Sequence, residues 1–459
     1  MVGAHPHGKP HRVWGDESEV VDRVLDYTEQ RVVRHGDPKA TARSASELAA
    51  AAGPTVTPAG IGGQAALRVF AEVLEPATRA QDDPLNLAYI AAAPTRAAVA
   101  FDLVTSAANI FGGIWEAGAG AIFAENEALA WITGLLGWPA GSGGCFVSGG
   151  TSGNLSALAT ARDAARRRRG GRPAGGWQLA CTTNAHSSIA AAARVLDVDV
   201  VQVPADERGH LTGEALREVL AQHPDVFAVV ASAGTTNEGL VDDLASVAAV
   251  CEEFGTWLHV DGAYGGAALA APSARHLFEG IERADSFIVD PHKWLFAPYD
   301  CCALLYREPE HARAAHTQHA SYLDSIDREQ WNPADYAAHL SRRARGLPFW
   351  FSLATHGTDK YRDAVERCLQ TTREVTEFIR DSGYLRLVRE PELSVVLFER
   401  PGFSDEQYAD WSKRAALAGD ILCVPTAWRG RTVLRLAFVN PETQAADVAA
   451  RLESLRGAQ

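Results

Sequence analysis

The spacing of hydrophobic residues predicts helices in the first part of the chain. Residues 18–34 carry apolar side chains at helical intervals, and residues 65–74 do the same after a break rich in proline and glycine at 53–63. The apolar positions of the first stretch are Val20, Val21, Val24, Leu25 and Tyr27. These helices hold too few apolar residues to form a core alone, so we expect them to pack against something else, such as a second subunit.

A different pattern begins near residue 144, where short runs rich in β-branched residues alternate with helical stretches. The runs lie at 145–147, 177–181, 200–203, 226–231, 257–260 and 286–289. Alternation of strand and helix predicts a parallel sheet with helices on both faces. The run at 302–306 follows the previous strand too closely for a crossover helix, so it could join the sheet as an antiparallel strand.

The pattern changes again after about residue 345. It predicts helices at 356–380, 405–417 and 442–455, with strand-like runs at 385–388, 394–398, 421–424 and 432–438. This mixture is typical of an α+β domain. We therefore expect an N-terminal helical segment at 1–82, a large domain at 83–345 and a small C-terminal α+β domain at 346–459.

Charge and composition exclude several classes of protein. The formal net charge is −14, and an acidic chain lacks the basic surface that nucleic acid or an anionic membrane requires. A hydrophobic content of 47% is that of a globular protein rather than a disordered one. No apolar run reaches the ~18 residues of a membrane span, and the N-terminus does not resemble a signal peptide. Seven cysteines without a CxxC or zinc pattern indicate reduced thiols, so we expect a cytoplasmic protein.

The segment Ser148-Gly149-Gly150-Thr151-Ser152-Gly153-Asn154 stands directly between a predicted strand and a predicted helix. Glycines allow close approach of a ligand, and the first N–H groups of a helix bind phosphate well. The segment does not match the GxGxxG or P-loop patterns, so it implies no dinucleotide or ATP. A tight strand–helix turn without a ligand is the alternative.

Three titratable residues follow predicted strands of the same sheet. Asp261 ends the strand at 257–260, where open α/β sheets bind ligands, although it could instead cap a nearby helix. Lys293, between a histidine and a tryptophan, is expected to be partly desolvated, which would lower its pKa and allow a Schiff base; a lysine with its charge in solvent is the alternative. His186 could stack on a planar ring or exchange protons, or it could be a satisfied core or capping histidine.

These residues together suit pyridoxal 5′-phosphate, whose phosphate needs N–H and hydroxyl donors, whose ring nitrogen needs an anion, and whose aldehyde needs an amine. A metal site is the weaker interpretation. His186, His259, Asp261 and His292 are candidate ligands, but they lack the His-x₃-His spacing of a helical ligand pair.

Four segments, FVSGGTSGNLSALATAR, NAHSSIAAA, WLHVDGAYGG and ADSFIVDPHKW, resemble the group II pyridoxal-phosphate-dependent amino acid decarboxylases. This family includes the aromatic-L-amino-acid, histidine and glutamate decarboxylases. The resemblance implies the type I, aspartate-aminotransferase-like α/β fold, with a mostly parallel seven-stranded sheet in the large domain. It also implies a homodimer with active sites at the interface, in which the N-terminal helices pack across the dimer.

The resemblance assigns roles to particular residues. Lys293 corresponds to the lysine that binds the cofactor covalently, and Asp261 to the partner of the ring nitrogen. His186 corresponds to the histidine stacked on the ring, and Ala263 to the small residue on its other face. Further matches are phosphate-binding positions at Gly150, Thr151, Ser286 and His292.

Two more assignments concern the substrate. Tyr322 resembles the tyrosine of a mobile loop that reaches the partner subunit's site and protonates the substrate carbon. Arg435 matches an arginine near the substrate carboxylate in glutamate decarboxylases. The segments at 86–95 and 115–127, where side-chain specificity is set, depart from the family pattern.

The resulting hypothesis is decarboxylation of an L-amino acid to an amine and carbon dioxide. Aromatic residues near the loop and the small domain favour an aromatic substrate, although some of them are expected to pack the core. These residues are Tyr322, Trp331, Tyr336, Phe349 and Trp350. Acidic, diamino and aliphatic amino acids, a lyase or aminotransferase on the same fold, and a non-enzymatic cofactor-binding protein are the alternatives.

Overall fold

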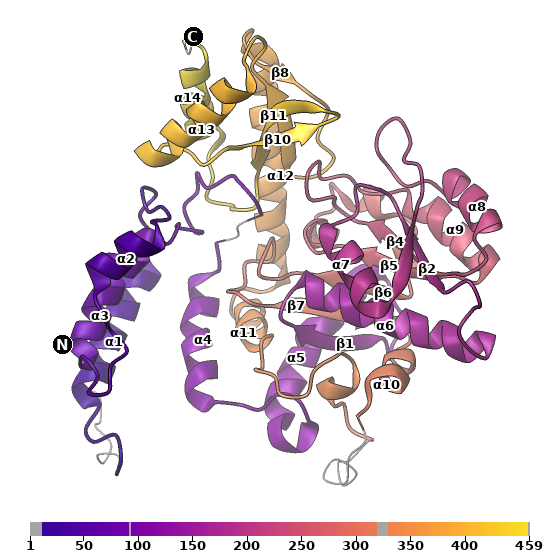
Figure 1. The fold of residues 1–459 in the computed structure, drawn as a ribbon, viewed down its shortest axis with the longest axis horizontal. Coiled ribbons are helices and arrows are strands. Elements are labelled where there is room, and N and C mark those ends of the chain that lie inside the picture. Colours follow the sequence, from indigo (N-terminus) through magenta and orange to yellow (C-terminus); the bar gives the residue numbers. More distant parts are fainter. Residues whose placement is uncertain (1–11, 91–92, 319–328, 458–459) are drawn as a thin grey trace.

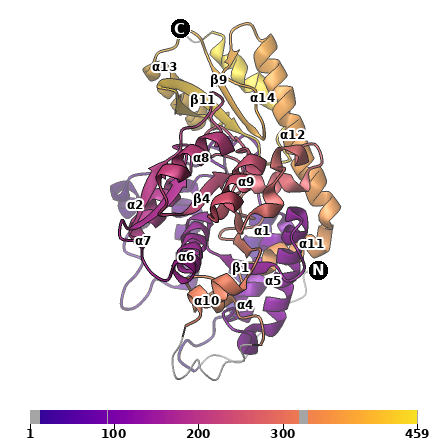
Figure 2. The ribbon, with the colours of Figure 1, turned by 90° about the vertical axis from the view of Figure 1, so that its right-hand side faces the viewer.

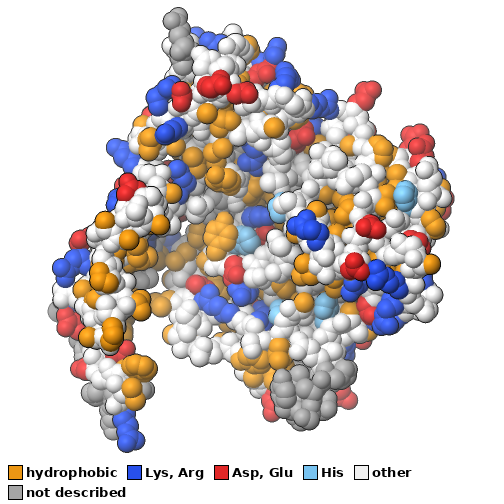
Figure 3. All heavy atoms as spheres, viewed as in Figure 1, with side chains coloured by type: hydrophobic (Ala, Val, Ile, Leu, Met, Phe, Trp, Pro, Cys, Tyr) orange, Lys and Arg blue, Asp and Glu red, His pale blue; other side chains and the backbone are white. Residues whose placement is uncertain are grey.

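The computed structural model describes residues 12–90, 93–318 and 329–457 of the 459-residue chain. Its N-terminal helices α1 (Ser18–Val33), α2 (Ala45–Ala52) and α3 (Gly63–Val69) stand along one side of the molecule (Figure 1). A short π-helical turn (Phe70–Leu74) and a 3-10 turn (Glu75–Ala77) complete this segment. None of these elements contains a buried residue, and Figure 3 shows apolar side chains along their outer surface. The segment therefore has no core of its own, as its composition predicts.

The large sheet has the order β1-β7-β6-β5-β4-β2-β3. Its strands are β1 (Gly143–Val147), β2 (Trp177–Cys181), β3 (Val198–Gln202), β4 (Val226–Ser232), β5 (Trp257–Asp261), β6 (Ser286–Val289) and β7 (Cys302–Tyr306). All neighbours pair in parallel except β7, which is antiparallel to both β1 and β6. The parallel sheet and its antiparallel member are confirmed.

Helices cover both faces of this sheet. They are α5 (Trp115–Leu136), α6 (Gly150–Arg169), α7 (Ser187–Leu196), α8 (Gly213–Gln222), α9 (Leu244–Phe254) and α10 (Glu310–His316), whereas α4 (Arg96–Ala108) packs against the later helix α11 (Leu347–His356). One core cluster joins α5, α8 and α9 to one face, and a second joins α6, α7 and α10 to the other. Residues alternate along each strand, so neighbouring residues of β4 and β5 enter different clusters.

The C-terminal part forms an antiparallel sheet of order β10-β11-β9-β8. Its strands are β8 (Arg386–Leu387), β9 (Val395–Glu399), β10 (Val424–Trp428) and β11 (Arg431–Ala437), and its helices are α11 (Leu347–His356), α12 (Thr358–Asp381), α13 (Asp405–Ala418) and α14 (Ala445–Leu452). Figures 1 and 2 show α12 running from the large sheet to this smaller unit.

Several element boundaries differ from the sequence prediction by a few residues, and two of the differences have a clear cause. The helix expected from residue 356 begins at Thr358, because Gly357 has a φ of +77° and separates α11 from α12. The strand expected at 421–424 begins only at Val424. Its earlier residues pair elsewhere, since the N–H of Leu422 donates to the carbonyl of Leu85 and its carbonyl accepts from Leu87. Within the described residues, no helix is long and apolar enough to cross a membrane.

Candidate active site

A cavity of about 340 Å³ lies where the parallel strands end. Residues that follow or end β1, β2, β4, β5 and β6 all contribute to its wall. Among them are His186, Asp261, Ala263, Lys293 and the turn at 148–151. The carboxyl edge of an open α/β sheet is the usual position for a ligand, and the sequence-predicted residues converge there.

The turn at 148–151 leads into α6. A Cβ on Gly150 would lie 3.2 Å from the Cβ of Ala263 and 3.2 Å from Oδ2 of Asp290, so a larger residue would crowd the cavity wall. The first N–H groups of α6 have no partner within the helix, and the helix dipole favours an anion at this end. The turn thus fits a phosphate.

Asp261, 7% exposed, stands at the end of β5 and accepts two hydrogen bonds. The N–H of Ala263 donates to Oδ1 at 3.0 Å, and Nδ2 of Asn154 donates to Oδ2 at 2.9 Å. Because each oxygen can accept more than one bond, Asp261 can also receive an N–H from a cationic ring.

Lys293 is held as a charged ammonium, whereas the sequence predicts a neutral amine. Its Nζ forms an ion pair with Oδ2 of Asp290 at 2.9 Å. Burial opposes the ammonium charge, but Asp290 and Asp261 outweigh it and raise the pKa of Lys293 above its ordinary value. The prediction that desolvation lowers this pKa is therefore wrong for the ligand-free protein, because Asp290, three residues earlier in the chain, supplies a counter-charge.

Asp290 itself is almost completely buried, with 1% of its surface exposed. Its Oδ1 has no hydrogen-bond partner in the described residues, and its Oδ2 lies 3.6 Å from Nε2 of His292. The carboxylate faces both Lys293 and the turn at Gly150. It is thus placed to exchange a proton with Lys293.

His186 precedes α7 and caps it, since its Nδ1 accepts from the N–H of Ser188 at 3.2 Å. An Nδ1 that accepts leaves the proton on Nε2. His292 is held by the backbone of Cys301, whose carbonyl oxygen lies 2.7 Å from Nδ1 and can accept its proton, and burial lowers the pKa of His292. Its ring centroid lies 4.7 Å from that of Tyr299, whose side chain borders the cavity.

Two predicted site residues do not line the cavity. Ser286 begins β6, at the opposite end of the strand, and its hydroxyl accepts from Nε1 of Trp257, so a phosphate contact by Ser286 is ruled out by its position. Arg435 is 7% exposed and donates to the carbonyls of Tyr89, Thr236 and Asn237. This placement corrects the expected contact with a substrate carboxylate; Arg435 instead holds the wall at Thr236. Tyr322 lies outside the described residues.

Sequence reasoning missed three residues of this region. Asn154 was noticed only as part of the glycine-rich segment, although a buried asparagine on the core face of a helix is itself a signal. Asp290 and Tyr299 flank Lys293 in the chain and share its cavity. Among the described residues, no three His, Cys, Asp or Glu side chains are grouped to hold a metal, so the metal interpretation finds no support in their geometry.

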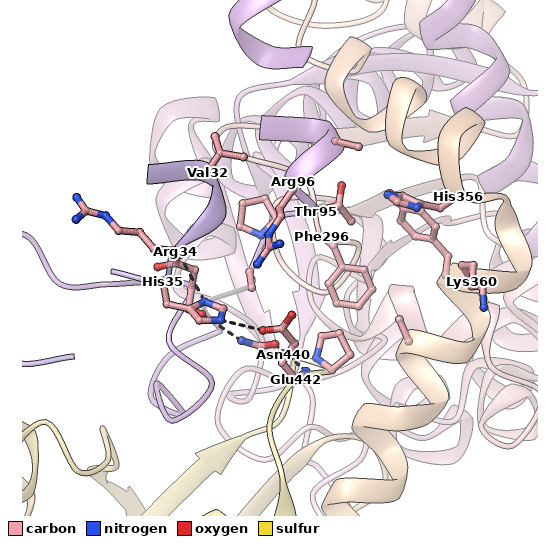
Figure 4. A pocket seen from close by; sticks show the side chains of 17 residues that line it. Val32, Arg34, His35, Thr95, Arg96, Phe296, His356, Lys360, Asn440 and Glu442 are labelled. Atoms are coloured by element: carbon pink, nitrogen blue, oxygen red, sulfur yellow. Dashed lines mark hydrogen bonds and ion pairs between the residues drawn. The ribbon is translucent and has the colours of Figure 1, made fainter. Parts of the chain in front are cut away.

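A second cavity, of about 410 Å³, lies between α1, α4, α12 and the loop at 440–442 (Figure 4). It shares no lining residue with the first. On its rim, His35 lies 3.0 Å from Glu442 and 4.0 Å from Asp82. It contains neither Lys293 nor Asp261, so the chemistry belongs to the first cavity.

Sequence comparison identifies relatives across most of the chain. Residues 64–400 match the pyridoxal-dependent decarboxylase conserved domain. Aromatic-L-amino-acid decarboxylase of Bacillus atrophaeus is 29% identical over 379 residues, which are 79% of this chain and 78% of that protein. L-2,4-diaminobutyrate decarboxylase of Rhizobium meliloti (strain 1021) is 32% identical over 375 residues, 78% of this chain and 74% of that protein.

Structural comparison extends the likeness to nearly full length. The crystal structure of Oryza sativa TDC with PLP and tryptamine has a TM-score of 0.87 at 24% identity and covers 96% of both chains. Mouse CSAD has a TM-score of 0.84 at 26% identity and covers 95% of this chain and 98% of that one. These likenesses confirm the predicted type I fold.

Proposed function

Because the chain belongs to the pyridoxal-dependent decarboxylase family, we propose that it converts an aromatic L-amino acid to the corresponding amine and carbon dioxide. Family membership establishes the reaction class, decarboxylation of an amino acid, and the cofactor, pyridoxal 5′-phosphate. The observation that carries the proposal for this site is the convergence of Lys293, Asp261 and the phosphate-binding turn on one cavity.

Each residue of the site has a task in this reaction. The turn at 148–151 would hold the phosphate, and the amine of Lys293 would bind the aldehyde. Asp261 would keep a proton on the ring nitrogen, while His186 and Ala263 would pack against the two faces of the ring. The bound cofactor supplies an electron sink for the bond to the departing carboxyl group.

Proton handling falls to residues of this chain. Asp290 Oδ2, 2.9 Å from Nζ, would hold Lys293 as an ammonium in the ligand-free protein, so Lys293 must lose a proton before its amine binds the aldehyde. Tyr322 would protonate the substrate carbon after carbon dioxide leaves, the role that the family resemblance gives it.

The aromatic substrate is supported by Tyr299. Its side chain is 57% exposed and borders the cavity, where it offers a flat apolar face beside His292. Of the other aromatic residues considered from the sequence, Trp331 and Tyr336 stack on each other, and Phe349 is fully buried against Phe146 and Tyr361. Tyr299 therefore carries the argument.

A diamino substrate is the second candidate, because the Rhizobium meliloti diaminobutyrate decarboxylase is 32% identical to this chain. The deciding experiment supplies purified protein and pyridoxal phosphate with L-tryptophan, L-tyrosine, L-phenylalanine, L-2,4-diaminobutyrate, L-glutamate and L-valine in turn. Carbon dioxide and amine are both measured. Preferred turnover of an aromatic acid supports the proposal, and preference for diaminobutyrate replaces it with the second candidate.

We further propose a cytoplasmic homodimer with shared active sites. The absence of buried residues from α1, α2 and α3, together with exposed Val20, Val21 and Val24, supports a partner for this segment. The seven cysteines are all free, as a reducing compartment requires. Mixed dimers of Lys293→Ala and Tyr322→Phe chains would regain amine production if Tyr322 acts in the partner's site, and would form no amine if it acts in its own.

A further inference from the structure

A chain of buried polar groups leads from Asn154, which borders the cavity beside Asp261, into the interior of the large domain. Trp257, His259 and Asp261 alternate along β5, so their side chains point to the same face of the sheet, where α6 packs. Asn154 of α6 and Ser286 of β6 complete the set, and both are fully buried. Buried polar groups are costly unless they are hydrogen-bonded, and every member of this chain has partners.

The amide of Asn154 sets the direction of these hydrogen bonds, because its Oδ1 can only accept and lies 2.8 Å from Nε2 of His259, which must therefore donate. The indole Nε1 of Trp257 can only donate, and it lies 2.8 Å from Oγ of Ser286. The Ser286 hydroxyl is then free to donate to Nδ1 of His259, also at 2.8 Å. With Nδ1 accepting, the proton of the neutral imidazole stands on Nε2, which donates to Oδ1 of Asn154 at 2.8 Å.

The neutral state of His259 agrees with its surroundings. Burial lowers the pKa of His259 to about 4, although the Asp261 carboxylate opposes the shift. The ring is fully buried, and both nitrogens already have partners that suit one tautomer. The neutral His259 ring therefore accepts a hydrogen bond from Ser286 and donates one to Asn154.

Asn154 is the branching point. Because its Oδ1 accepts from His259, its Nδ2 must face the other way, and the two hydrogens of Nδ2 donate to Oδ2 of Asp261 and Oγ of Ser188, both at 2.9 Å. Ser188 Oγ, accepting from Asn154, donates in turn to Nδ1 of His186 at 2.8 Å. One amide thus orients both residues proposed to contact the cofactor ring.

We propose that Asn154, held in one orientation by His259, Ser286 and Trp257, is a positioning residue that keeps Asp261 a hydrogen-bond acceptor toward the cofactor and keeps the proton of His186 on Nε2. The inference rests on the proposed placement of the pyridine ring against Asp261. A reversed amide would turn the lone pairs of Oδ1 toward Asp261 and favour the protonated carboxyl, which cannot hold a pyridinium.

Two variants and a control test the proposal. Asn154→Leu keeps the volume but removes the branching point, and Trp257→Phe removes only the distant donor. Thr160→Val is the control, because Thr160 is also buried on α6 and hydrogen-bonded, to Ser156 and His316, yet has no contact with Asp261. If the proposal holds, Asn154→Leu lowers kcat about 10- to 100-fold, the range for a lost hydrogen bond to a charged group, with a smaller change in KM.

The second readout needs no substrate. In ligand-free protein with ¹⁵N-labelled histidine, the ring nitrogens of His259 should show the neutral Nε2–H tautomer down to about pH 5, and its signal is assigned by its loss in His259→Gln. Trp257→Phe should introduce the Nδ1–H tautomer, and Asn154→Leu should weaken pyridoxal phosphate binding in a titration, whereas Thr160→Val should do neither.

The outcomes separate this inference from the proposed function. An Nδ1–H tautomer in the native protein, or an Asn154→Leu variant that binds the cofactor and turns over as Thr160→Val does, would overturn it. A native protein that binds pyridoxal phosphate but decarboxylates no amino acid would exclude the proposed function. In that case the tautomer of His259 and the cofactor-binding titration would still test the role of Asn154.

Discussion

The ion pair between Asp290 and Lys293 leads to a prediction about how the protein captures its cofactor. An amine attacks an aldehyde only when it is neutral, and Lys293 is held as an ammonium by a carboxylate 2.9 Å away with 1% of its surface exposed. A close opposite charge shifts a pKa by roughly 1–3 units. Asp290→Asn should therefore increase the neutral fraction of Lys293 at neutral pH by about one to three powers of ten.

The assay mixes ligand-free protein with pyridoxal phosphate in a stopped-flow instrument and follows the visible absorbance of the lysine-bound cofactor from pH 6 to pH 10. The pKa of Lys293 is raised above 10.5, so the midpoint of the native rate profile lies above this range, and we expect Asp290→Asn to move the midpoint to lower pH and into the range. Because Asp290 also faces the phosphate-binding turn, the experiment is repeated with pyridoxal, which has no phosphate. An unchanged midpoint with both aldehydes would refute the assigned role of the pair.

Three further outcomes test other parts of the account. Tyr322→Phe should still release carbon dioxide but divert product from amine to aldehyde, as product analysis would reveal; clean amine would remove the proposed role. Glu125→Gln should lower the free energy of unfolding by about 3–5 kcal/mol in urea titration, because it leaves Arg342 charged and buried without the carboxylate that now binds it twice at 2.7 Å; a loss below about 1 kcal/mol would contradict this reasoning. A hydrogen bond to Glu392 raises the pKa of His210. The stabilisation it adds is complete below pH ~6.5 and disappears as pH rises through the raised value. The difference in unfolding free energy between native protein and His210→Asn should accordingly be larger at pH 6 than at pH 9, and a constant difference would exclude the effect.

The large sheet was predictable because its strands are short, buried and rich in β-branched residues, each followed by a helical period. Boundaries were harder to predict where the deciding contact is distant in sequence. Leu422 looks like part of a strand of the small sheet, but it pairs with Leu85 and Leu87, which lie far earlier in the chain. No local sequence pattern predicts a pairing between segments so far apart in the chain.

The sequence predicted those residues of the site that directly end or follow a strand. Asp261 and Lys293 each follow a strand, and the turn at 148–151 has its own glycine signature. Ser286 was misplaced because it begins β6, whereas the cavity lies at the other end of that strand. The raised pKa of Lys293 cannot be predicted from burial alone, because the negative charge of Asp290, three residues earlier, outweighs the effect of burial.

The central claim is that the ε-amine of Lys293 captures pyridoxal phosphate covalently. Borohydride reduction of the native protein with its cofactor, followed by peptide mapping in a mass spectrometer, tests it directly. We expect a single phosphopyridoxyl label on Lys293 in the native protein and none in a folded Lys293→Ala variant. A label on another lysine, or a Lys293→Ala variant that still fixes the cofactor and releases carbon dioxide, would contradict the account.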